Sequence, residues 1–109
     1  MAYDEGLAQR LRELLERRRG VTEKKMFGGL CFLLHGSMFV GLVKQRLMVR
    51  VGPAAYPEAL KQPHARAMDF TGKPMKGYVF VEPAGLDDDA DLSAWVERAL
   101  TFVATLPRK

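Results

Sequence analysis

The sequence predicts one α+β domain, a two-layer sandwich in which an antiparallel sheet of five or six strands carries helices packed on one face. Segments with helical periodicity lie at the two ends of the chain, whereas the middle contains short apolar runs separated by glycines and polar turns. Helices that stand apart from a run of consecutive strands are typical of the α+β class. The expected order is a helix, four strands, a helix, one or two strands and a final helix.

The first helix is expected over residues 3–19. Its leucines recur at helical spacing and form one apolar stripe, at Leu7, Leu11, Leu14 and Leu15. Asp4 and Glu5 lie at the amino end, where the helix dipole favours negative charge, and Gly20 follows the carboxyl end, where a left-handed cap favours glycine. The run Arg17, Arg18 and Arg19 is then explained as favourable charge in the last turn.

Four strands are expected between residues 21 and 51, because apolar runs rich in Val, Leu, Phe and Met are interrupted there by turn sequences. The strands are placed at residues 21–26, 30–34, 38–43 and 47–51. The turns that separate them are Gly28-Gly29, His35-Gly36-Ser37 and Lys44-Gln45-Arg46. Such short connections predict an antiparallel meander.

The second half of the chain alternates between the two kinds of element. Residues 53–61 are expected to form a short helix whose regular hydrogen bonding begins at Pro57, and residues 67–70 and 78–81 are expected to be strands. The final helix is predicted by a nearly unbroken stripe at Leu92, Trp95, Val96, Ala99, Leu100 and Val103. The preceding aspartates, Asp87, Asp88 and Asp89, supply its cap.

Composition restricts the class of protein. A chain of 109 residues with 48% hydrophobic and 28% charged residues fits one globular domain, residues 1–109. The net charge of +4 is ordinary for a small domain, although it favours acidic partners. Cys31, alone and between apolar neighbours, is expected to be a buried, reduced thiol. With neither a signal peptide nor a membrane-spanning segment, a cytoplasmic location without membrane contact is expected.

The two central strands, at residues 30–34 and 38–43, are apolar on both faces, although a sheet with one face in water should alternate apolar and polar residues. This excess predicts that the second face is covered as well. The simplest cover is another copy of the chain, so a two-fold homodimer is expected.

Sequence motifs for catalysis, phosphate binding or metal binding are not found. The aspartates that start at Asp87 lack the glycine and the glutamate that an EF-hand needs at its sixth and twelfth positions, and they are interpreted as a helix cap. Gly28-Gly29 and Gly72-Lys73 lack the context of a phosphate-binding loop. His35, His64 and Cys31 show no spacing that pairs a nucleophile with a base. We therefore expect no enzymatic activity, no cofactor, no metal and no catalytic residue.

The segment from Lys76 to Pro83 nearly fits the RNP1 pattern of RNA-recognition motifs. Tyr78 and Phe80 are two residues apart and would project from one face of a strand, as stacking on successive bases requires. Because Val79 and Pro83 break the pattern and the chain begins with a helix, buried core aromatics are the favoured interpretation. Single-stranded nucleic-acid binding by this pair, with the nearby Lys73 and Lys76, remains the alternative.

Several blocks together resemble the N-terminal domain of the TfoX/Sxy family. In chain order, they are Met26-Phe27-Gly28-Gly29, the apolar strand with Gly36, Arg46-Leu47-Met48-Val49-Arg50-Val51, Met68-Asp69-Phe70-Thr71-Gly72, Pro74-Met75-Lys76-Gly77-Tyr78 and the acid-capped final helix. The resemblance implies an α+β fold similar to that of secretion chaperones. It also implies membership of a group that regulates natural competence together with the cyclic-AMP receptor protein. We expect the C-terminal helical domain of the full-length regulators to be missing, because this chain stops at Lys109.

The leading hypothesis is a non-enzymatic protein-interaction domain that acts in regulation by contacting a transcription factor or a similar protein. A pocket for a small molecule, which sequence patterns do not reveal, is the third hypothesis after nucleic-acid binding. The candidate interaction residues are Lys25, Phe27, Gly28, Gly29, Lys73, Lys76, Tyr78 and Phe80.

Overall fold

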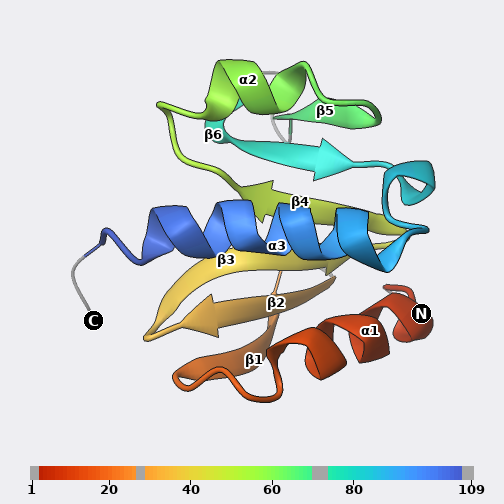
Figure 1. The fold of residues 1–109 in the computed structure, drawn as a ribbon, viewed down its shortest axis with the longest axis vertical. Helices are drawn as coiled ribbons and strands as arrows, with labels where there is room; N and C mark the ends of the chain where they lie inside the picture. Colours follow the sequence, from red (N-terminus) through yellow and green to blue (C-terminus); the bar gives the residue numbers. More distant parts are fainter. Residues whose placement is uncertain (1–2, 27–28, 70–73, 107–109) are drawn as a thin grey trace.

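The computed structural model describes residues 3–26, 29–69 and 74–106. In chain order, its elements are α1 (Glu5–Leu15), β1 (Val21–Met26), β2 (Gly29–Leu34), β3 (Ser37–Val43), β4 (Arg46–Arg50), α2 (Tyr56–Leu60), β5 (Ala65–Asp69), β6 (Pro74–Val81), the short 3-10 helix η1 (Pro83–Gly85) and α3 (Asp89–Val103). This order confirms the predicted α+β class, with six strands in the sheet (Figure 1).

The six strands form one antiparallel sheet in the order β1-β2-β3-β4-β6-β5. The first four are a meander, as predicted, and each pairs with the next. The last two exchange places, so that β6 pairs with β4 and β5 becomes an edge strand. This exchange places Tyr78 and Phe80 directly beside β4.

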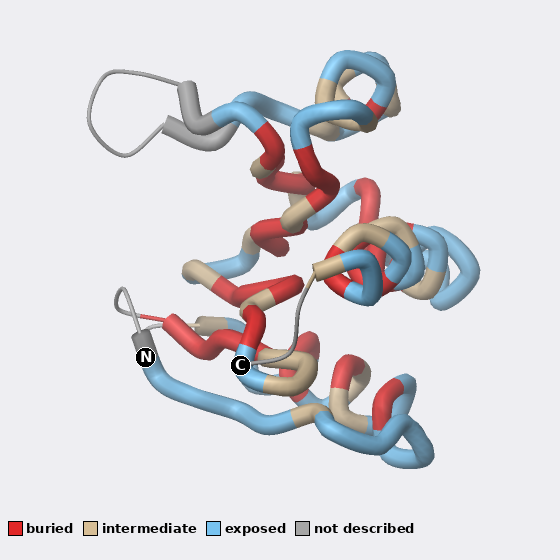
Figure 2. Tube along the Cα trace, turned by 90° about the vertical axis from the view of Figure 1, so that its left-hand side faces the viewer, coloured by how far each residue is buried: buried red, intermediate tan, exposed pale blue. Residues whose placement is uncertain are grey.

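The helices cover one face of the sheet. Figure 2 shows α1 and α3 on the same side of the sheet, and Figure 1 shows α3 crossing in front of its middle strands with α1 beside β1 and β2. Their apolar stripes meet the strands in one core, whose fully buried residues include Leu11, Phe32, Phe39, Leu42, Leu47, Val49, Val79 and Leu92. None of the helices in the described part of the chain is long and apolar enough to span a membrane.

Both long helices begin at an aspartate cap. The Asp4 side chain accepts a hydrogen bond from the Leu7 backbone amide at 3.2 Å, and the Asp88 side chain accepts one from the Ala90 amide at 2.9 Å. A side-chain acceptor of this kind satisfies a backbone donor that the first turn of a helix leaves unpaired. The predicted capping role of the aspartate run is therefore confirmed at Asp88.

The first helix is shorter than the predicted 3–19. It ends at Leu15, and Gly20 adopts a positive φ of 84° before β1. Beyond Leu15 this segment has only charged residues and a glycine, so no apolar side chain holds further turns against the sheet. The three arginines at residues 17–19 therefore lie outside the helix, and Arg18 instead forms an ion pair of 2.9 Å with Glu97 of α3.

Turns and one irregularity set the register of the meander. His35 and Gly36 both have positive φ, which is the backbone of a two-residue type I′ hairpin between β2 and β3. Further along this hairpin, the pairing shifts between Phe32 and Leu33. Phe39 and Val40, although consecutive, are therefore both buried in the core under the helices. The bulge explains part of the apolar excess that the sequence shows in these strands.

Helix α1 offers a matched test of the core. Leu11 is fully buried, whereas Leu14, one turn away on the same helix, is 41% exposed. We expect Leu11→Ala to lower the free energy of unfolding by about 2 to 5 kcal/mol, because it leaves a cavity under the helix. Leu14→Ala should change it by only about 0.5 kcal/mol or less. Urea unfolding of both variants measures the difference, and equal losses would show that α1 does not pack as described.

Candidate functional site

The side of the sheet opposite the helices is the candidate site, and we call it the outer face. Directly opposite residues of an antiparallel pair project to the same side, so the register assigns side chains to this face. One row runs across all six strands through Lys24, Cys31, Gly41, Met48, Phe80 and Arg66. We call it the central row; at ordinary strand spacing its ends are about 24 Å apart.

The middle of the central row is apolar and tightly packed. Cys31, Met48 and Phe80 are 2%, 1% and 4% exposed, and they form a second hydrophobic cluster separate from the main core. Half-buried apolar side chains pack around them, namely Leu33, Met38, Val43 and Tyr78. Gly41 makes this packing possible, because a Cβ there would lie 2.7 Å from the terminal methyl of Met48 and 3.2 Å from Cys31 Sγ.

Two arginines of β4 lie over the aromatic rings of β6. The guanidinium carbon of Arg46 is 4.3 Å from the centroid of the Phe80 ring, and that of Arg50 is 5.7 Å from the Tyr78 ring. Arg50 also lies 5.4 Å from the Phe102 ring of α3 and donates a hydrogen bond of 3.3 Å to the carbonyl of Met38. These contacts are of cation–π type and keep the two arginines close to the sheet.

Cations stand at both ends of the central row. Lys24 lies on the edge strand β1 and Arg66 on the opposite edge strand β5, and both side chains are exposed. Neither forms an ion pair with a carboxylate in the described part of the chain. The outer face therefore combines an apolar centre with a positive charge toward each edge.

The interaction residues predicted from the sequence do not all lie on the outer face. Tyr78 and Phe80 share the outer face, as their spacing predicted, with Phe80 buried and Tyr78 half-buried. Lys25 is opposite Leu30, which faces the helices, so the register places Lys25 on the other side of the sheet. Lys76 is exposed on β6.

The remaining candidates come from the glycine turn and the β5–β6 connection. Gly29 is buried at the start of β2, where a Cβ would run into the backbone carbonyl of Leu42. This close approach gives Gly29 a structural role in strand pairing. Phe27, Gly28 and Lys73 lie outside the described residues.

Sequence reasoning missed the two arginines that cover the aromatic rings. The sequence does contain a signal for them, because Arg46, Met48 and Arg50 are each two residues apart along β4 and must therefore share one face of the sheet. What the sequence lacks is the strand order. Only the pairing of β4 with β6 brings this alternation beside Tyr78 and Phe80.

Reactive groups of the described residues do not converge. No group of three or more His, Cys, Asp or Glu side chains that could hold a metal occurs among them. Cys31 is surrounded by apolar side chains, and its burial raises the pKa of the thiol above the ordinary value of 9.0. A neutral, enclosed thiol is a poor nucleophile.

The enclosure of Cys31 can be measured with a thiol reagent. Because the folded state favours the neutral thiol, we expect native protein at neutral pH to react with Ellman's reagent at least roughly tenfold more slowly than protein unfolded in urea. The same shift means that Cys31 contributes stability below pH 9 that is lost as the pH rises above it. Fast, complete labelling of native protein would show that neighbouring side chains do not enclose Cys31.

Comparison with known proteins gives one match. Residues 13–103, nearly the whole chain, match the family model of the TfoX N-terminal domain. No curated protein and no solved structure matches the chain. The match includes β1 to β6, all of α3 and the last turn of α1, and it confirms the resemblance seen in the sequence blocks. The chain therefore belongs to the TfoX N-terminal domain family.

Proposed function

We propose that this chain is a regulatory interaction domain without enzymatic activity, and that it binds an acidic region of a partner protein through its outer face. Membership of the TfoX N-terminal domain family supports a regulatory role related to competence, and this family is not a known enzyme family. The proposal adds the surface and the chemistry of the partner.

The observation that carries the proposal is the composition of the central row and its surroundings. Apolar side chains that are only half-buried surround the buried middle of the row, and one exposed cation lies on each edge strand, Lys24 and Arg66. An interface with an apolar middle and a charged rim is the usual anatomy of a protein-binding surface. A partner with apolar side chains between acidic ones matches this row, and its charges would guide it onto the face.

Charge favours such a partner over a second copy of the chain. Two outer faces placed against each other bring Arg46, Arg50 and the exposed cations of both copies into one interface. Like charges in an interface are repulsive, and desolvation increases their cost. The homodimer expected from the sequence stays a prediction, and light scattering of the purified protein measures it directly.

Nucleic acid is the other polyanion that a cationic face could bind. Base stacking needs accessible rings, yet Phe80 is 4% exposed and Arg46 lies over it. Stacking on this face would require Arg46 to leave the ring. The buried ring therefore supports protein docking in preference to stacking on bases.

Charge reversal at the two ends of the central row tests the proposal. The variant Lys24→Glu/Arg66→Glu changes exposed side chains that form no ion pair in the described part of the chain, so folding should be kept. In affinity purification from the native cell, we expect this variant to lose a partner that the wild type retains. The affinity for the recovered, purified partner should fall roughly tenfold or more, and the wild-type affinity should weaken as salt is added.

The matched control is Arg17→Glu/Arg19→Glu, which makes the same change in net charge at exposed positions after α1. It should keep the partner. Equal loss in both variants would mean that only overall charge matters, and equal retention would remove the outer face from the interaction. Saturable binding of single-stranded oligonucleotides that only the outer-face variant loses would replace the proposal with nucleic-acid binding.

A further inference from the structure

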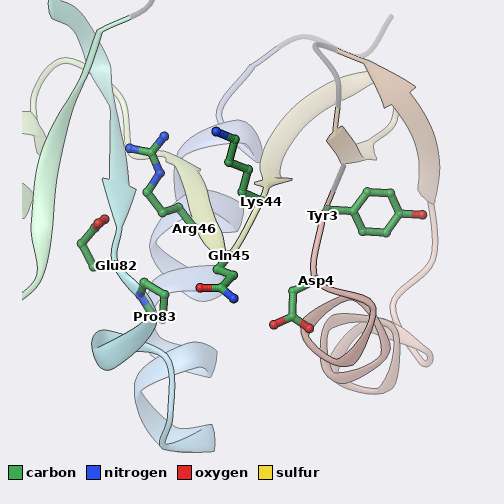
Figure 3. A pocket seen from close by; sticks show the side chains of 7 residues that line it. All are labelled: Tyr3, Asp4, Lys44, Gln45, Arg46, Glu82 and Pro83. Atoms are coloured by element: carbon green, nitrogen blue, oxygen red, sulfur yellow. The ribbon is translucent and has the colours of Figure 1, made fainter. Parts of the chain in front are cut away.

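A pocket of about 560 Å³ lies at the end of the sheet where three segments meet. It is formed by the residues before α1, the turn between β3 and β4, and the end of β6, and Figure 3 labels its lining side chains, which are Tyr3, Asp4, Lys44, Gln45, Arg46, Glu82 and Pro83. The volume is within the range of small-molecule sites.

Backbone hydrogen bonds fix the walls of this pocket. The Asp4 amide donates to the Lys44 carbonyl at 2.9 Å, which ties the N-terminal segment to the β3–β4 turn. The Glu82 amide donates to the His64 carbonyl at 2.9 Å and fixes the end of β6. The pocket is therefore formed before any ligand arrives, which lowers the entropic cost of binding.

The charged side chains around the pocket have no net charge in sum, yet they do not form ion pairs with one another. Lys44 and Arg46 are cations, Asp4 and Glu82 are anions, and no two of these four form an ion pair. Other surface charges of the described chain do pair, as Arg10 does with Asp89 at 2.8 Å. Separated charges of both signs around one pocket are complementary to a ligand that itself carries both signs.

Glu82 has the clearest need for a partner. Its Oε2 atom is shielded from solvent and has no hydrogen-bond partner among the described residues. A shielded carboxylate oxygen without a donor makes the negative charge of Glu82 costly. A positive group bound in the pocket beside the other oxygen of this carboxylate would offset that cost. Asp4 has no such need, because its Oδ1 already caps α1.

The cations are placed to hold the other end of the same ligand. Figure 3 shows Lys44 and Arg46 extending in the same direction from the β3–β4 turn, with Glu82 on the Arg46 side and Asp4 on the other side. The stacking of Arg46 on Phe80 at 4.3 Å restrains its guanidinium, which can form two parallel hydrogen bonds with a carboxylate.

We propose that this pocket binds a small zwitterion of the amino-acid class, with its carboxylate on Arg46 and Lys44 and its ammonium group on Glu82. The pocket shares Arg46 with the outer face, but its existence does not depend on the function proposed for that face, because its other lining residues and its ligand are different. The ammonium group places a positive charge and its donors beside the Glu82 carboxylate, and the ligand carboxylate neutralises two cations that form no ion pair with Asp4 or Glu82.

Amide NMR spectra of the full chain test the proposal. The common amino acids are added one at a time, with acetate and methylamine at equal concentration as probes that carry one charge each. We expect at least one amino acid to give saturable shifts at Lys44, Gln45, Arg46 and Glu82, while acetate and methylamine give much weaker ones. Shifts of equal size with acetate, or none with any amino acid, would overturn the proposal.

The variant Glu82→Gln provides the second arm, since it keeps the shape of the side chain and removes its charge. It should weaken amino-acid binding about tenfold or more, because a charge-assisted hydrogen bond becomes a neutral one. Glu13→Gln, at an exposed position of α1 away from the pocket, is the control and should bind as the wild type does. The spectra themselves report whether each variant is folded. Equal affinity of the two variants would remove Glu82 from the site and overturn the assignment.

Discussion

The antiparallel register of the four central strands fixes both the core and the candidate site. Leu42, Leu47 and Val81 are aligned on the face that meets the helices, and Gly41, Met48 and Phe80 are aligned on the outer face. If one strand shifted its pairing by one residue, its core side chains would turn to the outer face and its outer side chains would turn to the helices. The two hydrophobic clusters therefore depend on one another, although no side chain passes through the sheet. The surface proposed for docking is as strongly determined as the core, because the same ladder of hydrogen bonds positions both.

The helices are held by their apolar stripes more than by their charges. Arg10 of α1 pairs with Asp89 at the start of α3, and Arg18, in the segment after α1, pairs with Glu97 of α3. These pairs are largely exposed, and such pairs contribute only about 0 to 1 kcal/mol each. The Leu and Val residues buried on the sheet side supply most of the stabilisation. All three helices pack on the same face of the sheet, so no helix covers the outer face (Figure 2).

Arg46 connects the two proposed sites. Its guanidinium lies over the Phe80 ring of the outer face, and its side chain also lines the pocket beside Glu82. A carboxylate bound in the pocket and an acidic partner on the outer face would both bind the guanidinium of Arg46. Two ligands that share a group change each other's affinity by the same factor, so a small molecule in the pocket would alter docking on the sheet. If both proposals hold, the concentration of the small molecule would control the affinity of the chain for its protein partner.

The sequence by itself determined the fold class, the order of elements, the capping aspartates and the spacing that puts Tyr78 and Phe80 on one face. These follow from local periodicity and turn chemistry, which act over a few residues. The early end of α1 at Leu15 and the bulge that buries both Phe39 and Val40 were decided by packing against the sheet. The tertiary structure alone decided that β6 lies between β4 and β5, which sets Arg46 over Phe80 and brings Glu82 to the pocket. Strand order depends on which residues far apart in the chain pair with one another. Burial of the apolar surface of the whole domain determines this pairing, and local sequence patterns do not encode it.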